Sequence, residues 1–102
     1  MIVLNITYKG LRIEPTLNAS RELIKEGKDL YYVVKILEDG YDCSASRRGK
    51  DIIEKCLKKS NKEYKAVLVE TEVTYSDGFK ENILRLIHFG KISYKKIRRN
   101  KK

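Results

Sequence analysis

The sequence predicts an α+β fold, with an N-terminal strand, a helix hairpin and then an antiparallel sheet of about three to four strands. Three patterns lead to this prediction: apolar alternation at the start, helical spacing in the middle, and an Asp-Gly pair between two runs rich in β-favouring residues. With 102 residues, of which 41% are hydrophobic, the chain is expected to build one core. We expect a single domain over residues 1–90 and a flexible basic C-terminal tail over residues 91–102.

The first part of the chain predicts a strand followed by a helix. Apolar or aromatic residues alternate over Met1–Tyr8, as in a half-buried strand, and Lys9-Gly10 ends the pattern. Thr16–Glu26 has the spacing of a helix that ends at Gly27. Pro15 is tolerated in a first helical turn.

A second helix has the clearest pattern in the chain. Asp29 can cap its N-terminus, and Gly40 is expected to end it in a left-handed conformation. Between them, apolar residues recur at helical intervals, at Leu30, Val33, Val34 and Leu37. Because only Gly27-Lys28 separates the helices, we expect a compact hairpin against the sheet.

The remaining elements are strands. Residues 41–57 are compatible with helix or strand, and we favour strand because the sheet otherwise has few members. A turn is expected over Lys58–Lys62, and a long hairpin joins Tyr64–Tyr75 to Asn82–Phe89 through Ser76-Asp77-Gly78. Ideal alternation in the last strand places Leu84, Leu86 and His88 on one face, and Ile83, Arg85, Ile87 and Phe89 on the other. Both faces are partly apolar, as in a central strand.

Cysteine usage and the absence of a leader favour a cytoplasmic location. Cys43 and Cys56 are too few for a disulfide framework, so two reduced thiols are expected, with a bridge between them as the alternative. Residues 1–8 are too short for a signal sequence, and no apolar run approaches the length of a membrane span. The Lys, Glu and Ile richness and the lack of Gln resemble hyperthermophile proteins.

The excess positive charge lies mainly in the tail. Residues 90–102 hold seven basic residues and no acid, which is +7 of the net charge of +9. Such a run has polyanions as its partners, and RNA is the one that we expect. Tyr94 interrupts the run, and an aromatic among cations suits single-stranded RNA. The residues predicted to bind RNA here are Tyr94, Lys95, Lys96, Arg98 and Arg99.

A second basic cluster, Ser46–Lys50, has two interpretations. Exposed arginines and lysines most often only contact water. Alternatively, Arg47, Arg48 and Lys50 form a phosphate cradle, since a guanidinium offers a planar fork of donors.

His88 and Arg85 are the candidate catalytic residues. An imidazole suits proton transfer in RNA cleavage because its pKa lies near neutral pH, although a single His beside aliphatic residues is more often a core-edge residue. Arg85 projects from the opposite face of an ideal strand, so a bulge is needed to bring the two together. No Cys or His spacing predicts a metal site, and neither a metal nor another cofactor is expected.

The order of elements, together with Val-Val-Lys-Ile-Leu-Glu-Asp-Gly (33–40), Ser-Arg-Arg (46–48) and Arg-Leu-Ile-His-Phe-Gly-Lys (85–91), resembles the RelE-like and BrnT-like toxin superfamily over residues 1 to about 92. The resemblance implies a small metal-independent ribonuclease fold that binds mRNA and is neutralised by an antitoxin. Arg47, Arg48, Arg85 and His88 stand where they would fill its roles. Acidic residues near the implied cleft, at Glu70, Glu72 and Glu81, depart from a typical toxin and argue against nuclease activity.

Two functional hypotheses follow. The favoured one is a non-catalytic module of RelE-like type that binds RNA or a partner protein. The alternative is a metal-independent RNA endonuclease, the toxin of a toxin–antitoxin pair. The expected partners are RNA and an antitoxin protein, with no membrane, and the chain is expected to be a monomer or a homodimer.

Overall fold

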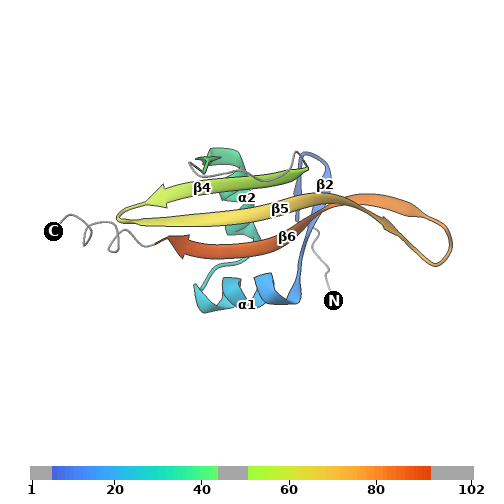
Figure 1. The fold of residues 1–102 in the computed structure, drawn as a ribbon, viewed down its shortest axis with the longest axis horizontal. Helices are drawn as coiled ribbons and strands as arrows, with labels where there is room; N and C mark the ends of the chain where they lie inside the picture. The colour runs from blue at the N-terminus through green and yellow to red at the C-terminus, as the bar shows by residue number, and fades with distance from the viewer. Residues whose placement is uncertain (1–5, 44–50, 93–102) are drawn as a thin grey trace.

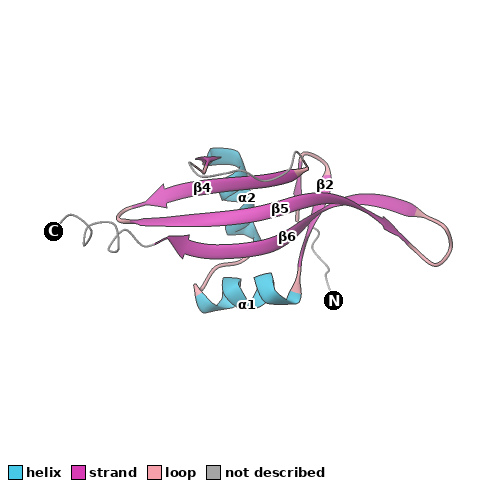
Figure 2. Cartoon of the chain, in the orientation of Figure 1, coloured by secondary structure: helices cyan, strands magenta, loops and turns pink. Residues whose placement is uncertain are grey.

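The computed structural model describes residues 6–43 and 51–92, and within them it confirms the α+β class. Two helices pack against a six-stranded sheet of order β1-β2-β6-β5-β4-β3, in which β2 and β6 are parallel and the other neighbours antiparallel (Figures 1 and 2). The elements are β1 (Thr7–Tyr8), β2 (Leu11–Pro15), α1 (Leu17–Lys25), α2 (Leu30–Asp39), β3 (Tyr41–Asp42), β4 (Ile52–Lys59), β5 (Lys62–Thr74) and β6 (Lys80–Ile92).

The N-terminal region contains a strand that the sequence did not predict. Only Thr7–Tyr8 of the expected first strand lie in the described sheet, since residues 1–5 are outside the described part. Lys9 and Gly10 have φ values of 53° and 81°, so the chain reverses in a two-residue turn and β2 pairs back onto β1. Pro15 ends β2, directly before the Thr16 cap of α1. Pro15 can occupy a strand end because it is the last residue of the ladder with β6.

Both predicted helices are confirmed to within one residue at each end. Side-chain oxygens cap them: Thr16 accepts from the Ala19 amide, and Asp29 accepts from the Tyr32 amide at 3.1 Å. The two helices pack on different strands, α1 on β6 and α2 on β4 and β5, and Figure 1 shows α2 running across the direction of α1. No helix within the described ranges is long and apolar enough to span a membrane.

Gly40 ends α2 for a different reason from the one predicted. Its φ of −81° and ψ of −175° are extended, so the expected left-handed conformation is wrong. Space is the constraint instead: a Cβ on Gly40 would clash with the carbonyl oxygens of Ile36 and Cys56, on α2 and β4. Only a residue without a side chain lets the end of the helix approach β4 this closely.

One hydrophobic cluster joins the helices to the sheet. Tyr32 meets Tyr64 and Phe89 edge-on, while the rings of Tyr64 and Phe89 stack at 5.8 Å. The buried members are Ile13 of β2, Ala19 and Leu23 of α1, Val33, Ile36 and Leu37 of α2, Tyr64, Ala66 and Leu68 of β5, and Leu84, Leu86 and Phe89 of β6. Both helices and strands β2, β5 and β6 therefore share one hydrophobic core.

The long β5–β6 hairpin is confirmed, and it extends beyond the rest of the sheet. Gly78 has a φ of 90° in the turn, and the Asp77 carboxylate accepts from the Phe79 amide. β4 pairs with β5 only as far as Val69, and β2 pairs with β6 only from Ile83 onward. Residues 70–82 therefore form a two-stranded projection, which we call the hairpin arm (right in Figure 1).

The strand interpretation of residues 41–57 is confirmed for β3 and for the part of β4 in that range, while residues 44–50 lie outside the described part. The expectation of reduced thiols is wrong, because Cys43 and Cys56 form a disulfide. Their spacing in the sequence gave no sign of this. The pairing of β3 with β4 places Tyr41 opposite Cys56, and this brings the two cysteine Cα atoms to 5.3 Å.

Reduction of the disulfide should lower the stability of the fold. The bridge closes a loop with a sequence separation of 13, and a loop of that size contributes about 3 kcal/mol by restricting the unfolded chain. Urea unfolding with and without dithiothreitol measures the difference. The Cys43→Ser variant, which keeps the buried Cys56, should be insensitive to the reductant; equal stability of the oxidised and reduced wild type would contradict the assignment.

Gly40→Ala should destabilise the protein by about 1–3 kcal/mol, because the new methyl group overpacks the contact between α2 and β4. Gly90→Ala is the matched control: it also adds a methyl group to a glycine, but it meets no atom within 4 Å. We expect it to change the free energy of unfolding by less than about 1 kcal/mol. Equal effects of the two substitutions would show that space does not explain Gly40.

Candidate nucleic-acid interface

The two predicted catalytic residues, Arg85 and His88, lie on the same face of β6 because the strand contains a bulge. His88 pairs with Val67 and Leu86 pairs with Leu68, so Ile87 between them has no partner on β5. Arg85 pairs with Val69. Since residues paired in register share a face, Arg85 and His88 both lie on the face away from the helices, which we call the outer face.

The bulge also corrects the predicted faces of β6. Phe89, not His88, joins Leu84 and Leu86 in the core. The sequence prediction was wrong from residue 88 onward, because the extra residue at the bulge inverts the alternation of all that follow.

A carboxylate faces each of these two side chains. Arg85 Nη2 lies 3.6 Å from Glu14 Oε1, and His88 Nδ1 lies 3.9 Å from Glu22 Oε1, with the two basic side chains 40% and 53% exposed. The same Glu22 oxygen accepts a hydrogen bond from the Phe89 amide at 2.9 Å, which holds it at the edge of β6. These carboxylates offset the positive potential that would stabilise a developing phosphate charge. Both candidate catalytic side chains therefore have a carboxylate neighbour in the fold.

Arg12, which the sequence analysis did not select, organises a second ionic cluster on the outer face. Its Nη2 lies 3.1 Å from Glu81 Oε1, and its Nη1 lies 3.3 Å from Glu14 Oε2. Tyr75 donates to Glu81 Oε1 at 2.6 Å. The hydrogen bond from Arg12 lowers the pKa of Glu81, and the hydrogen bond to Glu81 raises the pKa of Tyr75. Because Arg12 belongs to β2, this cluster ties the hairpin arm to the body of the sheet.

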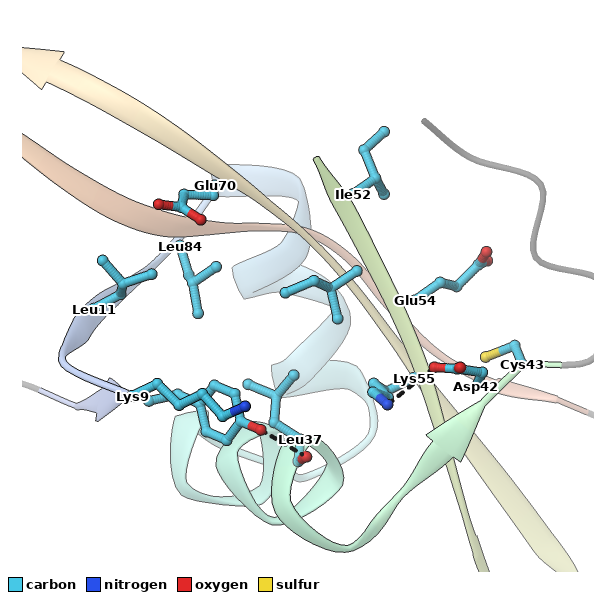
Figure 3. A pocket seen from close by; sticks show the side chains of 12 residues that line it. Lys9, Leu11, Leu37, Asp42, Cys43, Ile52, Glu54, Lys55, Glu70 and Leu84 are labelled. Carbon is cyan, nitrogen blue, oxygen red and sulfur yellow. Dashed lines mark hydrogen bonds and ion pairs between the residues drawn. The ribbon is translucent and has the colours of Figure 1, made fainter. Parts of the chain in front are cut away.

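A hollow of about 700 Å³ among the described residues does not suit a polyanion (Figure 3). It lies between the β1–β2 turn, the end of α2 and the β3–β4 region, with Leu11, Leu37 and Leu84 among its apolar lining. Two lysines line it, and Lys55 is already paired with Asp42 at 2.9 Å. The lining includes three carboxylates, those of Asp42, Glu54 and Glu70. Glu70, one of the acidic residues that the sequence analysis placed near a cleft, thus lines this hollow.

A second hollow, of about 370 Å³, has the opposite character. It lies at the β4–β5 turn, and we call it the lysine hollow; its lining is Lys28, Lys59, Ser60, Asn61, Lys62 and Tyr64. None of these residues is acidic. Lys59 and Lys62 are opposite each other in the β4–β5 ladder, and the Lys28 ammonium lies 4.3 Å from the centroid of the Tyr32 ring. The sequence showed a turn over residues 58–62, but not that Lys28 would join it.

The lysine hollow lies at the end of the sheet where the basic C-terminal sequence begins. Ile92, the last residue of β6, pairs with Glu63, which is the neighbour of Lys62 (left in Figure 1). Lys91 and Ile92 are therefore strand residues, and their predicted place in the tail is wrong. The predicted RNA-binding residues lie outside the described ranges; they are Arg47, Arg48, Lys50, Tyr94, Lys95, Lys96, Arg98 and Arg99.

The charges of the described residues balance. Residues 6–43 and 51–92 contain 14 basic and 14 acidic side chains, whereas the whole chain has 23 basic and 14 acidic ones. The net charge of +9 thus comes entirely from residues 44–50 and 93–102. Within the described part, no group of three His, Cys, Asp or Glu side chains is placed to hold a metal ion.

Comparison with known proteins identifies no relative. No family model, no curated protein and no solved structure matches this chain.

Glu81→Gln should loosen the hairpin arm, because it removes the carboxylate that Arg12 and Tyr75 share. The pKa of Glu81 is lowered in the folded state. The stability that its ionised form contributes is therefore fully present above the ordinary pKa of a glutamate, and it is lost as the pH falls through the lowered pKa. Amide hydrogen exchange of residues 71–82, corrected for intrinsic rates, should be faster in the variant than in the wild type at neutral pH. When the wild type is acidified, its exchange should become about as fast as that of the variant. Glu72→Gln, on the same arm, is the control, and equal acceleration by both variants would contradict the proposed clamp.

Proposed function

We propose that this protein binds single-stranded RNA without cleaving it, using the β4–β5 end of the sheet together with the basic sequence that follows β6. One observation carries the proposal. The described part of the chain is electrically balanced, yet it gathers Lys28, Lys59 and Lys62 at the end where β6 leads into a sequence with six basic residues and no acid.

Charge separation of this kind favours a linear polyanion. Each ammonium that meets a phosphate releases condensed counterions, and this release supplies most of the affinity of non-specific nucleic-acid binding. A compact anion could contact either the lysine hollow or the basic sequence after β6. A strand of RNA is long enough to contact both at once. Tyr94 lies within that sequence, and an aromatic ring can stack on an unpaired base.

The outer face supports binding without cleavage. Arg85 and His88 share that face, which is the observation that favours the alternative of an RNA endonuclease. Each of them, however, faces a carboxylate of its own, Glu14 and Glu22. A cleavage site would need the Arg85 guanidinium available for the substrate phosphate. The RelE-like type of the module, with an antitoxin protein as a further partner, is part of the proposal and stands on the sequence strings alone.

Labelled single-stranded RNA incubated with the full chain in EDTA should be retained on a filter and remain intact. The Arg85→Ala and His88→Ala variants should bind it as well as the wild type does. Defined cleavage that both substitutions abolish would establish the endonuclease instead. Failure of the RNA to bind would end the proposal.

The complex should weaken steeply with salt. With about five phosphate contacts and a slope of about 0.7 per contact, affinity should fall roughly a hundredfold between about 50 and about 200 mM salt. Replacing Lys95, Lys96, Arg98 and Arg99 by Gln in the full chain should reduce both the affinity and the slope. A complex that is insensitive to salt would remove the basic sequence from the account.

A further inference from the structure

We propose that the lysine hollow is a binding subsite for a terminal phosphate group of the RNA. This inference rests on the proposed function and adds the chemical group that the hollow recognises. The hollow also exists as a geometric feature without any nucleic acid, so it can be tested separately with inorganic phosphate.

The lining of the hollow offers hydrogen-bond donors around a small space. Lys28, Lys59 and Lys62 line it with Ser60, Asn61 and Tyr64, all of them residues with hydrogen-bond donors, and none of the lining residues is acidic. Its volume of about 370 Å³ is at the small end of ligand sites, enough for a phosphate with part of its sugar. A phosphate is the acceptor-rich group that such a set of donors matches.

The positive charges of the hollow repel one another in the free protein. Lys59 and Lys62 are directly opposite across the Ser60–Asn61 turn, and like charges in that position destabilise a strand pair. Neither has a carboxylate partner among the described residues. A bound anion would convert this repulsion into attraction, so the fold should gain stability when the subsite is filled.

Lys28 is the third cation, and its position is well defined. Its ammonium lies 4.3 Å from the centroid of Tyr32 and 5.1 Å from that of Tyr64. Contacts with two aromatic faces hold the long side chain over the core. Less conformational entropy is therefore lost when it contacts a ligand, as in other preorganised sites.

The number of cations favours a terminal phosphate over an internal one. An internal phosphodiester carries a single negative charge, whereas a terminal monophosphate carries about −1.5 to −2 at neutral pH and has three free oxygens. Three lysines lining one hollow match the terminal monophosphate better than the phosphodiester. The hollow would therefore hold one end of an RNA strand while the basic sequence after β6 contacts its backbone.

The test compares RNAs of one sequence that carry a 5′-phosphate, a 3′-phosphate or hydroxyl groups at both ends. The full chain should bind at least one phosphorylated form about tenfold more tightly than the hydroxyl form, the size of one charge-assisted hydrogen bond. Lys59→Gln combined with Lys62→Gln should abolish the difference. The control is Lys35→Gln combined with Lys80→Gln, which removes the same amount of charge from α2 and the hairpin arm. This variant should keep the difference in affinity between the phosphorylated and the hydroxyl RNA.

Inorganic phosphate provides the second measurement. It should shift the amide resonances of Ser60 and Asn61 and raise the melting temperature more than chloride at equal ionic strength, and the Lys59/Lys62 double variant should lose both effects.

The outcomes separate the two proposals. Salt-sensitive RNA binding that ignores terminal phosphates, with no shift at Ser60 or Asn61, would overturn the subsite and leave RNA binding intact. Phosphate binding at the hollow without any RNA binding would support an anion subsite and refute the proposed function.

Discussion

The packing of both helices onto one face of the sheet, α1 on β6 and α2 on β4 and β5, is the constraint on which the rest of the structure depends. Tyr64 and Phe89 stack within that core, and Tyr32 of α2 meets both rings. Because Tyr32 and Tyr64 also lie beneath the Lys28 ammonium, the core positions one cation of the lysine hollow. The outer face carries charged residues such as Arg12 and Arg85 together with the buried Val67 and Ile83, and β5 and β6 run on from the packed part of the sheet into the hairpin arm.

Ion pairing distinguishes the two ends of the sheet. At the hairpin arm, Arg12 satisfies Glu81 and Glu14, so its charge holds the structure together. At the β4–β5 turn, Lys59 and Lys62 oppose each other without a carboxylate partner among the described residues. Two opposed lysines without a described carboxylate partner, Lys59 and Lys62, give the fold a free-energy reason to bind an anion at this end. This asymmetry, rather than the net charge alone, supports the proposed function.

Local signals in the sequence predicted much of the fold. The Asp29 cap, the apolar spacing of α2 and the positive φ of Gly78 each depend on a few neighbouring residues, and all three were predicted. Features that depend on pairing between distant segments were missed. The bulge at Ile87 appears only when β6 is aligned with β5, and Arg12 meets Glu81 across 69 positions of sequence. In the candidate site, the sequence predicted a turn over residues 58–62 but not the lysine hollow. Lys59 and Lys62 face each other because β4 ends at Lys59 and β5 begins at Lys62, and the sequence did not predict these strand ends.

Photochemical crosslinking of single-stranded RNA to the full chain, with the crosslinked peptides identified by mass spectrometry, tests the central claim most directly. The account predicts crosslinks in the peptides that contain the Ser60–Asn61 turn and in those that follow Ile92. It also predicts that the peptide of β6 containing Arg85 and His88 is not crosslinked. Crosslinks concentrated at Arg85 and His88, with none at the turn, would contradict it and would place the RNA on the outer face.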